Sequence, residues 1–312
     1  MKSFDYEPSK WVSFRNKKVL DRVRKIKKED LTKHPNPDFK IQIIKDNEFG
    51  PRFIADILYR LKVSSDNKKK LVFILGNPDL GQRNVAHLIN KFKIDCRNLY
   101  VFCMDEFANQ DGDIAPEEWP YSLKYALMHN FYYKIEKNLR PPRNQFCSPS
   151  NNNLKDYGKM IADLGGADVV YGASGWTGHT ACIDPAIVGS EFEGDLEKWK
   201  KMGPRIMTLN PFTIAQISLH GLFGRAGDIA AVPPKAATIG PAEIIGAKLR
   251  SDWHGLTIGG SSTSWQKFIV RLIAHGPVTP LVSGSIMQTL KTDFNIMETI
   301  AEDIEPSWDI MW

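Results

Sequence analysis

Two neighbouring acidic residues, Asp105 and Glu106, end the apolar stretch LYVFCMDEF at residues 99–107. A carboxylate at the end of a buried strand is partly removed from water, which raises its pKa and makes it a usable general base. The alternative interpretation of either acid is a helix cap or a salt bridge in a loop. The stretch therefore contains a candidate general base, and a structural role for these acids stays open.

A second stretch, YGASGWTGHTACIDP at residues 171–185, combines three glycines with one histidine and one aspartate. Histidine transfers protons near neutral pH, and Asp184 follows His179 closely enough to orient it or to tune its charge. The alternative is a structural histidine that is hydrogen-bonded to backbone. We expect a glycine-rich turn that positions His179 and Asp184, with Thr177 beside the histidine.

Two further segments are candidate anion sites. GNPDLGQRN, residues 76–84, places Gly76, Asn77 and Gly81 before a predicted helix, with Arg83 as a nearby cation. It matches neither the Walker pattern nor GxGxxG, so a plain strand–helix turn remains open. GGSSTSWQK, residues 259–267, offers hydroxyl groups and Lys267, and its alternative is a helix cap with spare hydroxyls.

Several classes of site find no support in the sequence. No His, Cys, Asp and Glu spacing resembles a metal site, no G-x-S-x-G elbow is present, and no cofactor motif occurs. The four cysteines form no C-x-x-C pair, which favours reduced thiols. No apolar run reaches the roughly 18 residues of a membrane span, and no signal peptide is apparent. We expect a cytoplasmic protein without a cofactor or metal.

Apolar runs alternate with stretches of helical periodicity along the chain. Strands are predicted at 40–46, 71–75, 98–107 and 167–175, and helices at 49–64 and 122–135. The alternation continues through 236–247, 254–260, 265–274 and 279–288. This order predicts an α/β fold: a three-layer, doubly wound, mostly parallel, Rossmann-like sheet with helices on both faces. Ligands bind such sheets at the carboxyl ends of the strands, where the glycine turns and both acids lie.

The first part of the chain differs in composition from the rest. Residues 1–39 are polar and basic, and we interpret them as an N-terminal extension. We expect residues 40–312 to form a single domain. The basic run at 10–34 holds much of the net charge of +5, which is mild for a nucleic-acid-binding protein. A solvated helix face accounts for this run, and attraction to phosphate or to a membrane surface is the alternative. We expect neither a nucleic-acid nor a membrane partner.

The quoted motifs resemble those of a known family. CMDEF (103–107) is similar to a strand ending in M-D-E-[YF]. The stretch 171–185 follows G-G-x-G-x-D-G-H-x-A-F-N-E-P at Gly172, Gly175, Gly178, His179, Ala181 and Pro185. VPPKAATIG (232–240) is similar to a V-P-K segment before A-L-T-[VI]-G. These residues resemble the glucosamine-6-phosphate deaminase/isomerase family, which shares its fold with 6-phosphogluconolactonases.

The resemblance implies hydrolytic deamination with aldose–ketose isomerisation, in amino-sugar and carbohydrate metabolism. By similarity, Asp105 removes the C2 proton of the opened sugar, His179 assists ring opening and Asp184 supports the histidine. The products are fructose 6-phosphate and ammonia, the partner is a small sugar or sugar phosphate, and a homo-oligomer is expected. The resulting site prediction has a catalytic set and a substrate-binding set: Asp105, Glu106, His179 and Asp184; and Gly76, Asn77, Gly81, Arg83, Gly175, Thr177, Gly178 and Lys267.

The sequence departs from the family pattern at positions that are catalytic or phosphate-binding in the family. Thr177 stands in place of an aspartate, Asp79 enters the first glycine loop, and Ser218 stands where an arginine binds phosphate. Lys267 aligns only loosely with the family's phosphate lysine. These departures leave three alternatives open: a relative acting on a different or unphosphorylated sugar, a non-catalytic sugar-binding protein, and a lactonase that uses His179.

Overall fold

The computed structural model describes residues 4, 6–76, 80–185, 192 and 194–306 of the 312-residue chain. Within them a large sheet of seven parallel strands forms the middle layer, in the order β1-β10-β9-β6-β2-β3-β5. In chain order these strands are β1 (Phe39–Ile44), β2 (Leu71–Leu75), β3 (Leu99–Cys103), β5 (Phe146–Cys147), β6 (Val169–Gly172), β9 (Leu249–His254) and β10 (Thr292–Met297). Residues of β2 are buried throughout, as expected for a central parallel strand.

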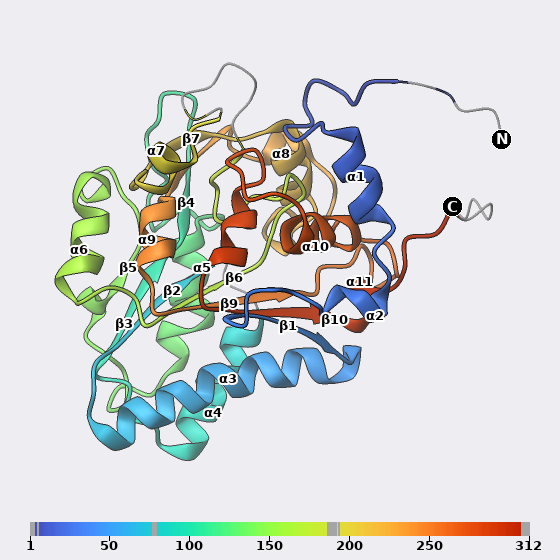
Figure 1. Cartoon of the computed structure of the whole chain (residues 1–312). Coiled ribbons are helices and arrows are strands. Elements are labelled where there is room, and N and C mark those ends of the chain that lie inside the picture. The colour runs from blue at the N-terminus through green and yellow to red at the C-terminus, as the bar shows by residue number, and fades with distance from the viewer. Residues whose placement is uncertain (1–3, 5, 77–79, 186–191, 193, 307–312) are drawn as a thin grey trace.

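Helices cover both faces of this sheet, which confirms the predicted three-layer fold (Figure 1). On one face α3 (Asp46–Asn67), α4 (Leu80–Phe92) and α5 (Leu123–Asn130) enclose one core cluster. The helices that contribute to the core on the other face are α1 (Lys17–Arg24), α2 (Lys28–Leu31), α6 (Tyr157–Asp163), α7 (Leu196–Lys200), α9 (Pro241–Gly246), α10 (Gln266–His275) and α11 (Glu298–Ala301). None of the helices in the described residues is long and apolar enough to cross a membrane.

A small antiparallel sheet stands beside the large one, in the order β4-β8-β7, and it was not predicted. Its strands are β4 (Asp105–Ala108), β7 (Arg205–Thr208) and β8 (Lys235–Thr238). The predicted strand at 98–107 is therefore two strands, because the chain changes sheets at Met104. Asp105 begins β4 and pairs with Thr238 of β8, so both acids lie in a strand and not in a loop.

Several other element predictions were correct in kind and displaced in position, whereas only His254 of the predicted segment 254–260 lies in a strand or helix. Segment 236–247 contains β8 and then α9, and 265–274 matches α10. Segment 279–288 falls largely in a 3-10 helix, and β10 follows it to complete the sheet. In the described part of the chain the remaining elements are α8 (Pro211–Ser218) and six 3-10 helices: η1 (Tyr132–Lys134), η2 (Arg143–Gln145), η3 (Leu154–Asp156), η4 (Gly221–Phe223), η5 (Ile229–Ala231) and η6 (Ser283–Thr289).

Helices α1 and α2 of the N-terminal segment pack against the large sheet's helical layer. Leu20, Val23 and Leu31 are buried in the same core cluster as residues of α10. Arg271 of α10 is fully buried and donates a hydrogen bond of 2.9 Å from Nε to the Ile26 carbonyl oxygen. Lys27 pairs with Asp303 at 2.9 Å, so part of the basic run faces acids near the other end of the chain. The boundary at residue 39 stays a prediction.

Candidate active site

The glycine-rich turn follows the carboxyl end of β6, as the sequence predicts. The Gly175 N–H donates to the His179 carbonyl oxygen at 3.0 Å, and the Gly178 N–H donates to the Gly175 carbonyl oxygen at 2.9 Å. Gly178 has a φ of +78°, a conformation that glycine adopts without steric cost. These bonds close the turn and fix the backbone position of His179.

Contacts from three other segments hold the turn in place. Gln266 Nε2 of α10 donates to the Ser174 carbonyl oxygen at 2.9 Å. The Trp176 N–H donates to Gln216 Oε1 of α8 at 2.6 Å, and the Thr180 N–H donates to Ser283 Oγ at 3.1 Å. Because these partners come from distant parts of the chain, the position of the turn depends on the completed tertiary fold.

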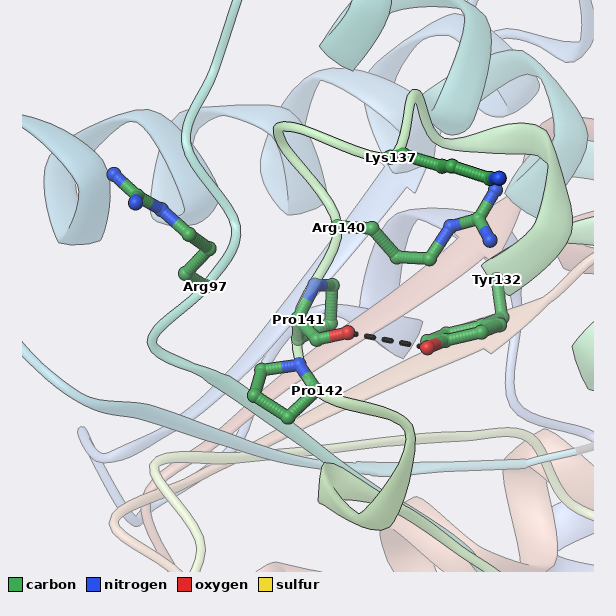
Figure 2. Close-up of a pocket in the computed structure, with 6 residues that line it drawn as sticks. All are labelled: Arg97, Tyr132, Lys137, Arg140, Pro141 and Pro142. Atoms are coloured by element: carbon green, nitrogen blue, oxygen red, sulfur yellow. Dashed lines mark hydrogen bonds between the residues drawn. The ribbon is translucent and has the colours of Figure 1, made fainter.

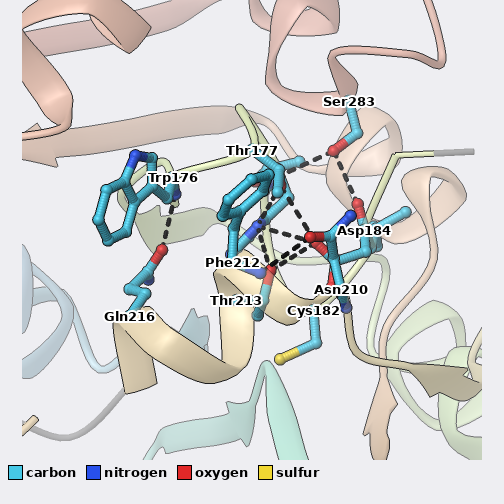
Figure 3. A network of polar contacts seen from close by, with 12 residues as sticks. Trp176, Thr177, Cys182, Asp184, Asn210, Phe212, Thr213, Gln216 and Ser283 are labelled. Atoms are coloured by element: carbon cyan, nitrogen blue, oxygen red, sulfur yellow. Dashed lines mark hydrogen bonds and ion pairs between the residues drawn. The ribbon is translucent and has the colours of Figure 1, made fainter. Parts of the chain in front are cut away.

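A polar network surrounds the Nδ1 atom of the buried His179. Figure 3 shows its members Thr177, Asp184 and Thr213. Nδ1 lies 2.7 Å from Thr177 Oγ1, 3.1 Å from Asp184 Oδ1 and 3.3 Å from Thr213 Oγ1. Thr177 and Thr213 both donate to Asp184 Oδ1, at 3.1 Å and 2.6 Å. Three oxygens around Nδ1 favour a proton there, which leaves Nε2 as the ring nitrogen that can exchange a proton with a ligand.

Asp184 is the negative centre of this network. Burial alone raises the pKa of a carboxyl group, but the charge and hydrogen bond of His179 hold the pKa of Asp184 below its ordinary value. The Asn210 N–H adds a hydrogen bond of 2.7 Å to Oδ2. Asp184 is therefore a buried carboxylate in direct contact with Nδ1 of His179, and the supporting role that the resemblance implies for it stays a prediction.

Asp105 meets the same segment from the small sheet. Its Oδ1 accepts a hydrogen bond of 2.8 Å from the Cys182 N–H, three residues after His179 in the chain. Burial raises the pKa of Asp105 above its ordinary value, although hydrogen bonds from Thr238 and Cys182 and the charge of His179 partly offset this. A buried carboxylate with a raised pKa beside an acid–base histidine can act as a general base.

The sequence is similar to those of curated glucosamine-6-phosphate deaminases, although no family model matches the chain. The protein from Phocaeicola vulgatus is 29% identical over 224 residues, which cover 65% of this chain and 76% of that protein. The protein from Caenorhabditis elegans is 27% identical over 209 residues, which cover 64% of this chain and 68% of that protein.

Solved structures agree on the fold. A monomeric glucosamine-6-phosphate deaminase superposes with a TM-score of 0.65 at 18% identity, over 84% of this chain and 98% of its own. A 6-phosphogluconolactonase from Shewanella baltica has a TM-score of 0.55 at 13% identity, over 82% of this chain and 97% of its own. In sequence the chain is thus similar to glucosamine-6-phosphate deaminases, and in fold it resembles both a deaminase and a 6-phosphogluconolactonase.

Glu106, the second predicted acid, has a different environment from Asp105. Adjacent residues of a strand point to opposite faces, and the Glu106 carboxylate lies at the start of α5. It accepts the N–H groups of Leu123 and Lys124 at 2.9 Å and 2.8 Å, and burial raises its pKa to about 7. These contacts are those of a helix cap, and they give no support to a catalytic role.

The predicted phosphate-binding residues do not gather around His179. Asn77 and Asp79 lie outside the described residues. The Arg83 guanidinium donates to Asn130 Oδ1 at 2.6 Å, and the Lys267 ammonium pairs with Glu302 at 3.1 Å. Gly76 donates its N–H to the Tyr171 carbonyl oxygen at 2.9 Å between β2 and β6, and Gly81 lies in α4. A phosphate site made of this set stays a prediction without a supporting contact.

The hydroxyl groups in the segment 259–264 bond to residues that lie close to them in the chain. Ser261 Oγ donates to the Ile258 carbonyl oxygen at 2.6 Å. Ser264 Oγ accepts the Gln266 N–H at 3.0 Å, as a residue before a helix does. These contacts agree with the alternative interpretation of the segment as a helix cap.

Sequence reasoning missed Asn210, Thr213 and Gln216, which come from α8. The Asn210 side chain caps this helix by accepting the Phe212 N–H at 2.9 Å, and Pro211 occupies the first turn. The Asn-Pro pair signals a helix start, but nothing local signals that Thr213 reaches Asp184. Ser218, the one residue of this helix that the comparison with the family motif singled out, donates to the Ala215 carbonyl oxygen instead.

Two buried ionisable residues, Asp252 and His254, lie on one face of β9. Oδ1 of Asp252 and Nε2 of His254 have no hydrogen-bond partner among the described residues. His254 Nδ1 accepts the Ser174 N–H at 3.4 Å, which links it to the glycine turn. Burial raises the pKa of Asp252 to about 7 and lowers that of His254 to about 3, so both are mainly uncharged in weakly acidic solution.

The raised pKa of Asp252 predicts a pH-dependent stability. Between pH 4 and pH 7 the unfolded chain has released this proton and the folded chain retains it, so stability falls as the pH rises. A pKa that moves from 3.8 to about 7 corresponds to a loss on the order of 4 kcal/mol. We expect Asp252→Asn to unfold at higher urea concentration than the wild type at pH 8, with a smaller difference at pH 4.

The control is Asp111→Asn, which replaces an exposed acid. It should change the urea midpoint of unfolding at neither pH 4 nor pH 8. Burial also raises the pKa of Glu106 to about 7, so Glu106 makes the stability depend on pH over the same range. The stability of the Asp252→Asn variant should therefore still fall somewhat as the pH rises. Equal destabilisation of Asp252→Asn at pH 4 and pH 8 would contradict the assignment.

A separate surface cavity of about 450 Å³ lies away from this site (Figure 2). Arg97 and Arg140 line it, with Tyr132, Lys137, Pro141 and Pro142. Arg97 precedes β3, whereas His179 follows β6, and these strands run parallel in one sheet. The cavity is thus at the opposite edge of the sheet from the candidate active site.

Proposed function

We propose that the chain isomerises and deaminates an amino sugar, as its relatives' name implies for glucosamine 6-phosphate. The observation that carries the proposal is the buried Asp105 carboxylate, joined through Cys182 to the segment that holds the His179–Asp184 pair. Proton removal next to a carbonyl needs a base with a raised pKa, and ring opening needs an acid–base group at the ring oxygen.

The proposed steps use these two groups in turn. His179 Nε2 exchanges protons with the ring oxygen and the C1 hydroxyl, which opens the ring to the aldehyde. Asp105 takes the C2 proton, the C2–H electron pair forms a C1–C2 double bond, and the C1 carbonyl oxygen takes up a proton to become a hydroxyl group. A proton then returns to C1, while the electron pair of the nitrogen forms the C2–N double bond. The amine is then an imine at C2, and water hydrolyses it to a ketose and ammonia. Asp184 keeps His179 oriented throughout.

The test is the release of ammonia and ketose from glucosamine 6-phosphate and from glucosamine by the purified full chain. We expect both products in equal amounts from at least one of the sugars. Sugar binding without either product would contradict the proposal and would favour a non-catalytic sugar-binding protein.

Lactone hydrolysis is a second candidate, because 6-phosphogluconolactonases share the fold. A lactonase uses a base to activate water, and lactone hydrolysis does not remove the C2 proton. Asp105→Asn should therefore spare lactone hydrolysis and abolish deamination, which separates the two candidates in one variant.

The hydroxyl group of Thr177 should matter through His179. It lies between Nδ1 and Asp184 Oδ1, so Thr177→Val leaves two buried polar atoms with one partner fewer. We expect kcat to fall roughly tenfold and its pH profile to shift, since a network hydrogen bond is worth about 1 kcal/mol. Thr177→Ser keeps the hydroxyl and should restore most of the rate. A valine variant with unchanged kcat and pH profile would contradict this role.

A further inference from the structure

An aromatic group lies beside the His179 network. Trp176 directly precedes Thr177, its side chain is 38% exposed, and its ring stacks on Trp265 at 5.3 Å between centroids. Phe212 lies 6.3 Å from Trp176 on the other segment that builds the network. Figure 3 shows the Trp176 indole to one side of the polar residues, with its backbone bonded to Gln216.

Trp176 is held rigidly, although part of it is open to solvent. Its N–H is bonded to Gln216, and its ring packs nearly parallel to Trp265, at an interplanar angle of 16°. The neighbouring Ser174 is clamped by Gln266 of the helix that follows Trp265. An exposed large aromatic ring that is already ordered binds an apolar ligand face with little loss of conformational entropy.

The charge around the network does not suit a phosphate ester. Asp105 and Asp184 are acidic, and His179 is the one basic group bonded to either of them in the described residues. Arg83 and Lys267 are bonded elsewhere. The segments 77–79 and 186–191, which the structure does not describe, contain no Lys or Arg in the sequence.

We propose that Trp176 is the sugar-binding platform of this site and that the substrate is an amino sugar without a phosphate. The C–H face of a pyranose ring is apolar and stacks on an aromatic ring, while its hydroxyl groups point to the polar network. This inference rests on the proposed function and specifies its substrate class. Specificity then comes from ring stacking and uncharged hydrogen bonds.

The test measures binding apart from turnover. Glucosamine and glucosamine 6-phosphate are titrated into the full-length Asp105→Asn protein by calorimetry. We expect glucosamine to bind at least as tightly as its phosphate ester. Adding Trp176→Ala should weaken glucosamine binding roughly tenfold, since aromatic contacts of this kind contribute about 1 kcal/mol or more. Trp176→Phe should retain most of the affinity, which excludes loss of fold as the cause.

Two controls make the result specific. Tyr59 of α3 is 68% exposed in a different layer, and Tyr59→Ala should leave binding unchanged. Arg225, an exposed arginine that follows η4, is the alternative phosphate ligand for this test. Tenfold tighter binding of glucosamine 6-phosphate that Arg225→Ala removes would overturn the inference.

The outcomes distinguish this inference from the proposed reaction. Trp176-dependent glucosamine binding without ammonia release in the wild type would support the platform and contradict the reaction. Ammonia release from glucosamine 6-phosphate alone, at an unchanged rate in Trp176→Ala, would support the reaction and overturn the platform.

Discussion

Replacing Asp105 by Asn is expected to lower kcat for ammonia release about a thousandfold, within the range observed when a general base is removed. The amide oxygen still accepts the Cys182 N–H, so the fold should be kept, and because burial raises the pKa of Asp105 the urea midpoint near neutral pH should stay the same or rise. Wild-type and variant rates are compared at saturating sugar, with ketose measured in parallel.

Glu106→Gln is the matched control for this experiment. It is the neighbouring buried acid, but its carboxylate bonds to the start of α5. We expect the glutamine variant to keep a kcat close to that of the wild type while its stability changes. A large loss of kcat in Glu106→Gln with full activity in Asp105→Asn would exchange the roles of the two acids.

The raised pKa of Asp105 also fixes the direction of the pH dependence. A base acts in its deprotonated form, so the rate should rise with pH through a pKa above the ordinary value of 3.8. A rate that falls over that acidic range would contradict the assignment of Asp105 as the base.

Replacing Gly175 by Ala is expected to lower kcat about a hundredfold without unfolding the protein. A Cβ atom at this position would lie 2.1 Å from Cε1 and from Nε2 of His179, so the imidazole must move. A displacement near 1 Å at a reacting group costs about this factor. The variant is measured for kcat and for its urea midpoint.

Gly221→Ala is the control for the glycine substitution. Gly221 follows α8 closely, and an added Cβ there meets no atom within 4 Å. Its rate should match the wild type. If Gly175→Ala retains the wild-type kcat, Nε2 of His179 is not the reacting nitrogen.

The core of the fold was predictable because buried parallel strands are continuous apolar runs. The strand predicted at LVFIL, residues 71–75, has the same bounds as β2. The break at Met104 was not predictable, since apolar residues continue on both sides of the point where the chain changes sheets. The small sheet depends on pairing between segments more than a hundred residues apart, which local periodicity does not reveal.

The site was predictable where its residues share one motif. His179, Thr177 and Asp184 lie in one turn, and the structure bonds them to one another. Thr213 reaches the same atoms from α8, and its sequence neighbourhood carries no sign of this contact. The predicted cations, Arg83 and Lys267, failed to join the site because each has a nearer partner, Asn130 or Glu302.

The most direct test of the account is hydrogen exchange at C2 of the amino sugar. Glucosamine and glucosamine 6-phosphate are incubated in D2O with the wild type and with Asp105→Asn, and C2 deuteration is followed by NMR. We predict deuterium at C2 of the recovered substrate with the wild type and none above background with the variant. Equal deuteration by both proteins would show that Asp105 does not remove the C2 proton.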